Sequence, residues 1–253
     1  MPIQFPKKPG LVIYLTAGDP DLGTTKQIAI AAIDAGADVL ELGVPFSDPL
    51  ADGPVIQRAM ERAVGRGVRL TDVLTLCKEI RAERPKAGLI LFSYLNPVLR
   101  MGLESFCAEA NAAGADGVLL TDMIVEEAAD YMAAMKKHGL APVFLAAPTS
   151  PDDRLKAIAE HTEGFLYAIS RTGITGVSST LSDDASKLVQ RIRQFTDKPI
   201  ALGFGVSNAE HVRTVGEYAD AAVIGSAIVA IIEKSTPQEA PAAVADFVRG
   251  LRG

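Results

Sequence analysis

Short apolar runs rich in β-branched residues alternate with longer segments of helical period along nearly the whole chain. Each run is followed by a segment long enough to form a helix. This alternation is typical of repeated βα units around a parallel sheet. The eight runs that we expect to form strands are residues 11–16, 39–43, 89–93, 117–121, 142–146, 164–169, 199–203 and 221–225.

The alternation predicts an α/β fold, and its regularity favours a closed barrel. An open, doubly wound sheet also alternates strands and helices. Eight evenly spaced units, with the richest loops all placed after strands, favour a single (β/α)8 TIM barrel. The 253 residues show no break in composition, so we expect residues 1–253 to form one catalytic domain. The expected helices are residues 24–35, 71–83, 103–113, 126–137, 151–160, 182–196, 209–215 and 237–251.

A small residue followed by aspartate precedes three of the expected strands. These aspartates are Asp38, Asp116 and Asp220, before the second, fourth and eighth strands. The repetition indicates that the chain uses the same turn between a helix and each of these even-numbered strands. Convergence on favourable turn chemistry would give the same pattern.

Composition excludes several classes of protein. Apolar residues make up 48% of the chain, and the net charge of −6 comes with no basic cluster, so we expect no nucleic-acid partner. No apolar stretch approaches the roughly 20 residues needed to span a bilayer, so we expect no membrane association and a cytoplasmic protein. Cys77 and Cys107 fall within helical patterns, where a cysteine usually behaves as a small buried hydrophobe.

Residues that bind metals or form Schiff bases lie away from the loops after the strands, where TIM-barrel active sites form. His138 and His161 end expected helices and His211 lies within one, so we expect no metal site. A Schiff-base enzyme needs a lysine at the carboxyl end of a strand. Lys198, the nearest of the eleven lysines, precedes a strand instead.

Three carboxylates follow the second expected strand within residues 41–54. Glu41 stands between two leucines at the end of that strand, where its side chain points into the barrel or toward its open mouth. Burial favours the neutral, proton-donating form of a carboxyl group, so we interpret Glu41 as functional. Asp52 lies later, in a proline-rich loop before Gly53. Its local pattern fits a catalytic carboxylate, a helix cap or a turn residue nearly equally.

Glycine-rich segments follow the sixth, seventh and eighth expected strands, at residues 170–176, 203–207 and 225–229. Glycine lets backbone N–H groups approach an anion, and a helix opening at Ser226 would direct its positive end toward it. Barrels commonly hold phosphate in these last loops, so together the three segments predict a phosphorylated substrate.

At these residues the chain resembles the α subunit of tryptophan synthase over nearly its whole length. The matching stretches are residues 14–20, 41–54, 147–149, 170–176, 203–207 and 225–229. The resemblance implies a lyase that cleaves indole-3-glycerol phosphate to indole and D-glyceraldehyde 3-phosphate in L-tryptophan biosynthesis. Two stretches differ from the family pattern: residues 1–10, which replace a short helix, and residues 121–125.

The resemblance also implies roles for individual residues. Glu41 and Asp52 become the catalytic pair. The loop after the sixth strand becomes a lid that brings Thr175 toward Asp52. The implied phosphate ligands are Gly176, Gly205, Gly225 and Ser226, and the residues implied to line the indole site are Tyr14, Tyr167 and Phe204.

The implied reaction requires no metal or organic cofactor, because a protonated indole ring can itself accept the electrons of the breaking bond. Pyridoxal phosphate is expected only in a partner β subunit, with which the family forms an α2β2 heterotetramer. Three alternatives remain: a stand-alone indole-glycerol-phosphate lyase, another phosphosugar isomerase or aldolase on the same barrel, and a non-catalytic scaffold that stimulates a partner enzyme.

Overall fold

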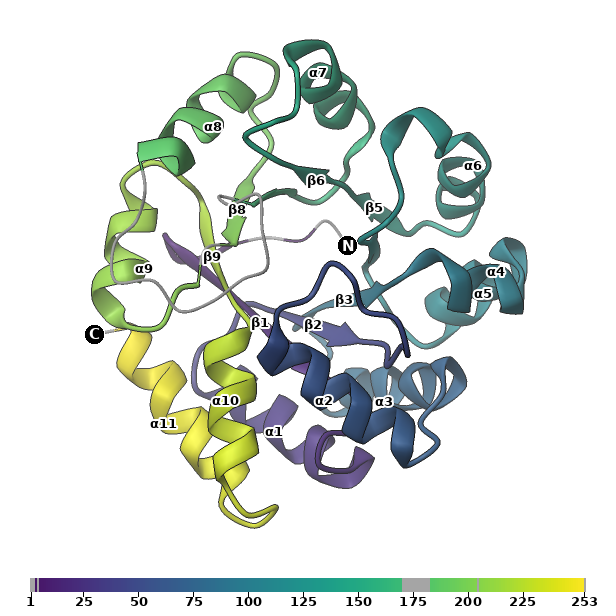
Figure 1. Ribbon diagram of the computed structural model, residues 1–253, viewed down its shortest axis with the longest axis vertical. Coiled ribbons are helices and arrows are strands. Elements are labelled where there is room, and N and C mark those ends of the chain that lie inside the picture. Colours follow the sequence, from purple (N-terminus) through teal and green to yellow (C-terminus); the bar gives the residue numbers. More distant parts are fainter. Residues whose placement is uncertain (1–2, 4, 170–182, 204, 253) are drawn as a thin grey trace.

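The computed structural model describes residues 3, 5–169, 183–203 and 205–252, and its centre is a nine-stranded parallel sheet ringed by helices (Figure 1). The sheet has the strand order β5-β4-β3-β2-β1-β9-β8-β7-β6. The strands are β1 (Gly10–Thr16), β2 (Val39–Gly43), β3 (Gly88–Ser93), β4 (Gly117–Leu120), β5 (Ala141–Val143), β6 (Leu145–Ala146), β7 (Leu166–Ile169), β8 (Ile200–Gly203) and β9 (Ala221–Ile224).

The two edges of this sheet are joined by a single residue, Phe144. β5 pairs with β4 and β6 pairs with β7, and the Phe144 carbonyl accepts a hydrogen bond from Tyr167 N at 3.2 Å. β5 and β6 therefore act as one interrupted strand, which corresponds to the run predicted at residues 142–146. The expected barrel of eight strands is confirmed, with this strand divided in two.

Helices follow the strands in the predicted order, with differences at their ends. α2 and α4 lie in stretches where the sequence was not assigned a helix, and the helix expected at residues 126–137 divides into η1 and α6. The helices are α1 (Leu22–Asp34), α2 (Pro54–Gly65), α3 (Leu70–Glu83), α4 (Leu95–Met101), α5 (Leu103–Ala112), η1 (Val125–Glu127), α6 (Ala129–Lys137), α7 (Asp152–His161), α8 (Asp183–Arg193), α9 (Ala209–Gly216), α10 (Ser226–Lys234) and α11 (Ala240–Arg252).

Side chains alternate between the barrel interior and the layer beneath the helices. Along β1, Val12 and Tyr14 belong to the inner apolar cluster, whereas Leu11, Ile13 and Leu15 belong to the outer one. The period of two is the one expected for strands whose two faces are both covered. Each barrel strand therefore places every second side chain on the axis, where the site lies.

The three repeated aspartates join neighbouring strands at the amino end of the barrel. In each case the side chain accepts a hydrogen bond from the first residues of the preceding strand. The pairs are Leu11 N to Asp38 at 2.8 Å, Leu89 N to Asp116 at 2.8 Å and Ile200 N to Asp220 at 2.9 Å. The small-residue–aspartate pair that precedes β2, β4 and β9 thus makes the same contact each time.

An arginine from a surrounding helix completes each contact. Arg252 of α11, Arg81 of α3 and Arg193 of α8 form ion pairs with Asp38, Asp116 and Asp220 respectively. Each carboxylate therefore has both a backbone donor and a positive charge. Such a fully partnered group supports the fold rather than chemistry.

The amino-terminal segment packs against the bottom of the barrel. Ile3 is buried within the inner cluster, and the ring of Phe5 meets that of Phe165 edge to face at 5.9 Å. The side chains of Ile3 and Phe5 thus cover apolar residues at this end of the barrel. None of the described helices is long and apolar enough to cross a membrane.

Candidate active site

Glu41 is the middle residue of β2 and lies inside the barrel, and its side chain is fully buried. In the sheet it stands opposite Tyr14 of β1 and Ile90 of β3. Leu40 and Leu42, its neighbours in the chain, point outward into the other apolar cluster. The prediction from the flanking leucines is therefore confirmed as regards position: the carboxyl group faces the axis.

The carboxyl group of Glu41 has no hydrogen-bond partner for either oxygen among the described residues. Burial disfavours its charged form and raises its pKa from 4.5 to about 8. At neutral pH the group consequently holds its proton. A buried, protonated and unpartnered carboxyl is an available proton donor, and it is costly to retain for packing alone.

Asp52 is 5% exposed and lies in the loop between β2 and α2. Burial raises its pKa to about 6, although a hydrogen bond from Tyr94 acts in the opposite direction. Tyr94 Oη donates to Asp52 Oδ2 at 2.8 Å and accepts from Ala51 N at 3.0 Å. The N-cap residue of α2 is Gly53, so Asp52 is not the cap of this helix. At neutral pH Asp52 is ionised while Glu41 is not.

Two tyrosines lie on the inner face of the barrel, each over a glycine. A methyl group built at Gly43 would lie 2.3 Å from Tyr14 Oη, and one built at Gly203 would lie 2.9 Å from Tyr167 Oη. Burial raises the pKa of both tyrosines, and the charges of Asp52 and Glu41 raise both further. Tyr14 belongs to the inner apolar cluster and Tyr167 packs against it, so both line the interior that Glu41 faces.

The loops after β8 and β9 carry three of the residues that were expected to bind phosphate. Gly205 has a φ of 46°, a conformation that favours glycine. Gly225 is the N-cap of α10, which begins at Ser226 as the sequence predicts. A methyl group built at Gly225 would lie 3.6 Å from Tyr14 Cβ, so the amino end of α10 adjoins the tyrosine. Thr175, Gly176 and Phe204 lie outside the described residues.

α2 and α10 are held together beside the mouth by an ion-pair cluster. Arg62 of α2 binds Asp19 through two bonds of 2.8 Å and Glu233 of α10 through one of 2.8 Å. Arg58 adds two further bonds to Glu233. This cluster keeps the helix that follows Asp52 aligned with the helix that begins at Ser226.

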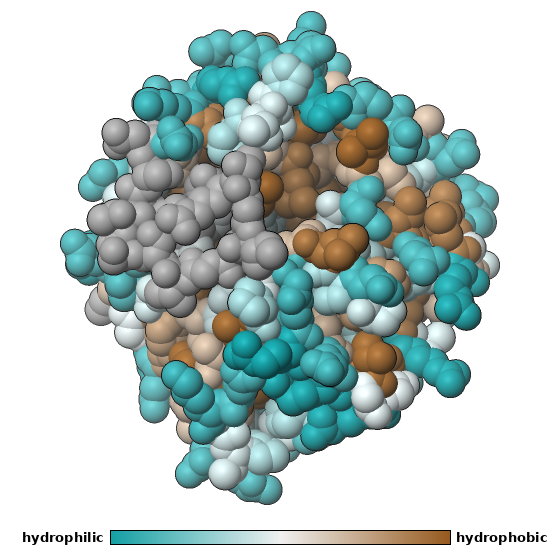
Figure 2. Space-filling model, in the orientation of Figure 1, coloured by the Kyte–Doolittle hydropathy of each residue, from teal (hydrophilic) through white to brown (hydrophobic). Residues whose placement is uncertain are grey.

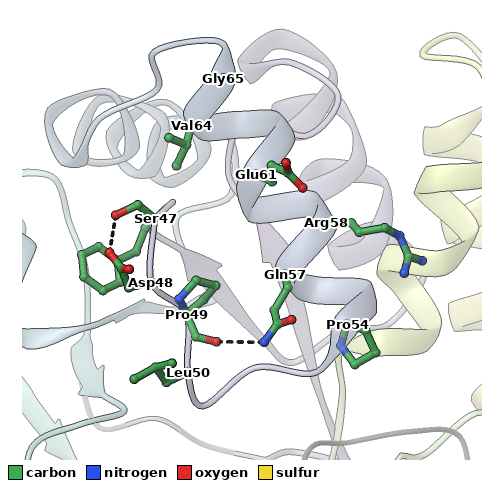
Figure 3. Close-up of a pocket in the computed structure, with 11 residues that line it drawn as sticks. Ser47, Asp48, Pro49, Leu50, Pro54, Gln57, Arg58, Glu61, Val64 and Gly65 are labelled. Atoms are coloured by element: carbon green, nitrogen blue, oxygen red, sulfur yellow. Dashed lines mark hydrogen bonds between the residues drawn. The ribbon is translucent and has the colours of Figure 1, made fainter.

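A groove of about 700 Å³ lies on the outer side of the loop between β2 and α2 (Figure 3). Its walls include Phe46, Leu50 and Val64, and neither Glu41 nor Asp52 lines it. In Figure 3 the amide of Gln57 reaches the Pro49 carbonyl, which joins the loop to the helix. The groove is therefore separate from the interior in which Glu41 is buried.

Exposed apolar side chains occur on the segments that follow three successive strands. Leu50 follows β2 and is 86% exposed, Leu99 lies on α4 after β3 and is 52% exposed, and Ile124 follows β4 and is 45% exposed. Figure 2 shows apolar residues gathered near the middle and along one side of this face. Asp122 accepts a hydrogen bond from Leu95 N at 2.7 Å, which ties the second of these segments to the third.

The cysteines and the lysine that were not expected to take part in chemistry have structural surroundings. Cys77 and Cys107 are buried and free, and burial raises the pKa of their thiols to about 12 and about 11. Lys198 caps α7 by donating to the carbonyls of Ala159, Glu160 and Thr162. Among the described residues no group of histidine, cysteine, aspartate and glutamate is arranged to hold a metal ion.

Sequence reasoning missed two hydroxyl-bearing residues of the site, Tyr94 and Thr16. Tyr94 directly follows β3, and Thr16 ends β1 with its Oγ1 3.2 Å from Tyr14 Oη. Both stand at the carboxyl end of a barrel strand, which is the general signal for such residues. That signal alone does not separate them from other strand-end residues.

Comparison with known proteins gives one consistent result. The model of the family described as "Tryptophan synthase alpha chain" matches residues 3–250. The chain is 52% identical over 230 residues to the tryptophan synthase alpha chain of Solibacter usitatus, covering 91% of this chain and 86% of the relative. It is 47% identical over 242 residues to that of Neisseria meningitidis, covering 96% and 92%.

Solved structures agree with the sequence relatives. A tryptophan synthase a2b2 complex from Pyrococcus furiosus contains a chain with a TM-score of 0.91 and 40% identity, covering 98% of this chain and 99% of that chain. Tryptophan synthase of Mycobacterium tuberculosis contains one with a TM-score of 0.89 and 35% identity, covering 97% and 93%.

Proposed function

The chain belongs to the tryptophan synthase alpha chain family, and we propose that its barrel mouth cleaves indole-3-glycerol phosphate with Glu41 as the proton donor. The observation that carries this proposal is the carboxyl of Glu41, buried on the axis without a partner and with a pKa of about 8. Residues 1–253 act as one catalytic domain. The enzyme is a lyase of L-tryptophan biosynthesis, and we place it in the cytoplasm.

The reaction needs an acid that later serves as a base. Glu41 protonates C3 of the indole ring, which makes the ring an electron sink. The bond from C3 to the side chain then breaks, and its electrons return to the ring and restore the indole. Glu41, now a carboxylate, takes the proton of the adjacent hydroxyl as the aldehyde forms. Protons balance over the cycle, so the enzyme ends as it began.

Asp52 has a different role, because it is ionised where Glu41 is not. Protonation of C3 places positive charge on the indole ring, and a carboxylate near the ring N–H stabilises it. Tyr94 holds Asp52 by a 2.8 Å hydrogen bond. We therefore assign proton transfer to Glu41 and electrostatic stabilisation to Asp52.

The phosphate binds at the amino end of α10. Ser226 and Gly225 lie where backbone N–H groups of that helix point outward, and the helix dipole favours an anion there. Gly205 contributes from the adjacent loop, and Gly176 is expected to do so from the loop after β7, whose Thr175 is expected to approach Asp52 when substrate binds. Tyr167 and Phe204 are the proposed contacts of the indole ring, together with the ring of Tyr14. Anchoring the phosphate positions the reacting carbon at Glu41.

The partner that we propose is a tryptophan synthase β subunit, in an assembly like the a2b2 complex of the Pyrococcus furiosus relative. Leu50, Leu99 and Ile124 give the surface around the mouth an apolar character that suits a protein interface. Residues 121–125, which differ from the family pattern, form part of it. Pyridoxal phosphate belongs to that β subunit, and the reaction in this chain requires no cofactor. Family membership disfavours the stand-alone lyase.

An assay of indole release tests the proposal. The full chain is incubated with indole-3-glycerol phosphate, alone and with a β subunit of the family, and free indole or tryptophan is measured. Asp52→Asn should reduce turnover about a hundredfold, the usual effect of removing one group that stabilises transition-state charge. Asp246→Asn is the control, because Asp246 is an exposed acid on α11. Absence of both indole and tryptophan from the wild type under both conditions would refute the assignment.

A further inference from the structure

Two hydroxyls on the inner face of β1 form a hydrogen bond beside the catalytic pair. Tyr14 Oη and Thr16 Oγ1 are 3.2 Å apart, and either can be the donor. Tyr14 is 3% exposed and Thr16 is 2% exposed. Because side chains alternate along a strand, both residues share the interior face of β1 with Val12.

This pair contains one donor more than its own hydrogen bond uses. Each hydroxyl carries one proton and two lone pairs, so one O–H remains after the pair has formed its bond. Within the described part of the chain, neither hydroxyl makes another hydrogen bond. A buried donor without an acceptor is costly. The unused donor is therefore available to an acceptor on a bound molecule.

Tyr14 lies between the phosphate end of the site and the two carboxylates. Its Cβ would be 3.6 Å from a methyl group built at Gly225, beside the amino end of α10. Its hydroxyl lies over Gly43 at the end of β2, the strand that carries Glu41. Tyr14 also stands directly opposite Glu41 in the pairing of β1 with β2.

We propose that the hydroxyls of Tyr14 and Thr16 bind the oxygen atoms of the three-carbon chain that connects the phosphate to the indole ring. The inference rests on the proposed function and extends it to recognition of the substrate's middle portion. A molecule whose phosphate lies at α10 and whose ring lies near Asp52 must pass its three-carbon chain across this pair. The pair thus selects a hydroxylated chain, while the aromatic ring of Tyr14 stays available to the indole.

The reverse reaction, condensation of indole with glyceraldehyde 3-phosphate, measures the two halves of the substrate separately. KM for each is determined with the full chain as wild type, Tyr14→Phe and Thr16→Val. Each variant removes one hydroxyl with little change in shape. KM for glyceraldehyde 3-phosphate should rise about tenfold in each, the effect of one buried hydrogen bond, while KM for indole stays within about twofold.

Two further variants separate substrate binding from a purely structural effect. Thr16→Ser keeps the hydroxyl and should restore KM for glyceraldehyde 3-phosphate. Tyr131→Phe removes another buried hydroxyl, which donates to Val118 O at 3.1 Å in the outer layer, and should change neither KM.

The outcomes are distinct. An unchanged KM for glyceraldehyde 3-phosphate in both Tyr14→Phe and Thr16→Val overturns the inference, and so does a rise confined to the KM for indole. A wild-type chain that turns over neither indole-3-glycerol phosphate nor its two products instead contradicts the proposed function, and with it the substrate assumed here.

Discussion

Carboxylates that are buried or partly buried occur at both ends of the barrel, and their surroundings are opposite. At the amino end, Asp38, Asp116 and Asp220 each accept a backbone hydrogen bond and face an arginine. At the carboxyl end, Glu41 has no hydrogen-bond partner among the described residues and Asp52 has Tyr94. The same chemical group is thus neutralised by its neighbours at one end and left reactive at the other.

The carboxylates at the two ends also differ in the direction in which their pKa values are shifted. Burial pushes the pKa of Asp220 upward, but hydrogen bonds from Lys8, Ile200 N and Arg193 outweigh it and leave the pKa below its ordinary value. Burial acts on Glu41 without such opposition and raises its pKa to about 8. The ionised form of Asp220 is therefore favoured by folding, whereas ionisation of Glu41 opposes it, as expected of a group retained for the proposed proton transfer.

The strongest test of this contrast is Glu41→Gln. Turnover should fall about a thousandfold, because the amide cannot donate the proton that the reaction needs. The free energy of unfolding at neutral pH should rise instead, because the variant lacks a carboxyl whose pKa is higher in the folded state than in the unfolded one. Measurements of indole release and of urea denaturation on the same preparations check both effects.

The pH dependence of that stability difference has a definite sign. The unfolded carboxyl ionises above about pH 4.5 and the folded one above about pH 8, so ionisation favours unfolding increasingly between these values. Glu41→Gln should therefore gain stability relative to the wild type as the pH rises from 4.5 to 8. A variant with near wild-type turnover, or with a stability difference independent of pH, would contradict this account.

Asp38→Ala should produce the converse result. It removes the acceptor of Leu11 N and leaves Arg252 without its partner, so the free energy of unfolding should fall by about 3 kcal/mol. Turnover per folded molecule should stay unchanged, because Asp38 lies at the opposite end from the site. Asp246→Ala breaks the exposed pair with Arg249 and should hardly affect stability. Loss of turnover in folded Asp38→Ala would contradict the assignment of a purely structural role to the carboxylates at the amino end.

The pH profile of the reaction gives a smaller effect and a finer test. Glu41 must be protonated and Asp52 ionised, so kcat/KM should be highest between about pH 6 and about pH 8. It should fall about tenfold per pH unit beyond either limit. Tyr94→Phe removes a hydrogen bond that lowers the pKa of Asp52, so the acid limb should move to higher pH and the alkaline limb should not. Movement of both limbs would show that the two carboxylates do not act separately.

The arrangement of strands was largely predictable from the sequence because a fully buried strand is apolar on both faces. The run at residues 39–43 matches β2 residue for residue. The division at Phe144 was not predictable, because the residue is apolar like its neighbours and the interruption depends on which partner each half finds. α4 was missed because Pro97 interrupts a stretch of only seven residues, which is too short for a clear helical period.

Some residues of the candidate site were also predictable from the sequence and others were not. Glu41 could be identified because a charge between leucines has no ordinary explanation, and the structure places it on the axis. Asp52 could not be separated from a cap or turn residue by local pattern. Its hydrogen bond to Tyr94 spans 42 positions, so only the folded chain reveals it. The role of Thr16 depends on alternation along a strand together with the neighbouring tyrosine, which sequence reasoning placed in the indole site for its ring alone.

The aspartates at the bottom of the barrel also bear on the order in which the chain folds. Asp38 reaches back 27 positions and Asp116 also 27, whereas the bonds from Arg252 to Asp38 and from Lys8 to Asp220 span 214 and 212. Contacts between near neighbours form with a smaller loss of chain entropy than contacts between distant ones. Adjacent strands can thus be set in register while the chain is still open, and the same aspartates then receive the distant cations that fasten the first strand to the last.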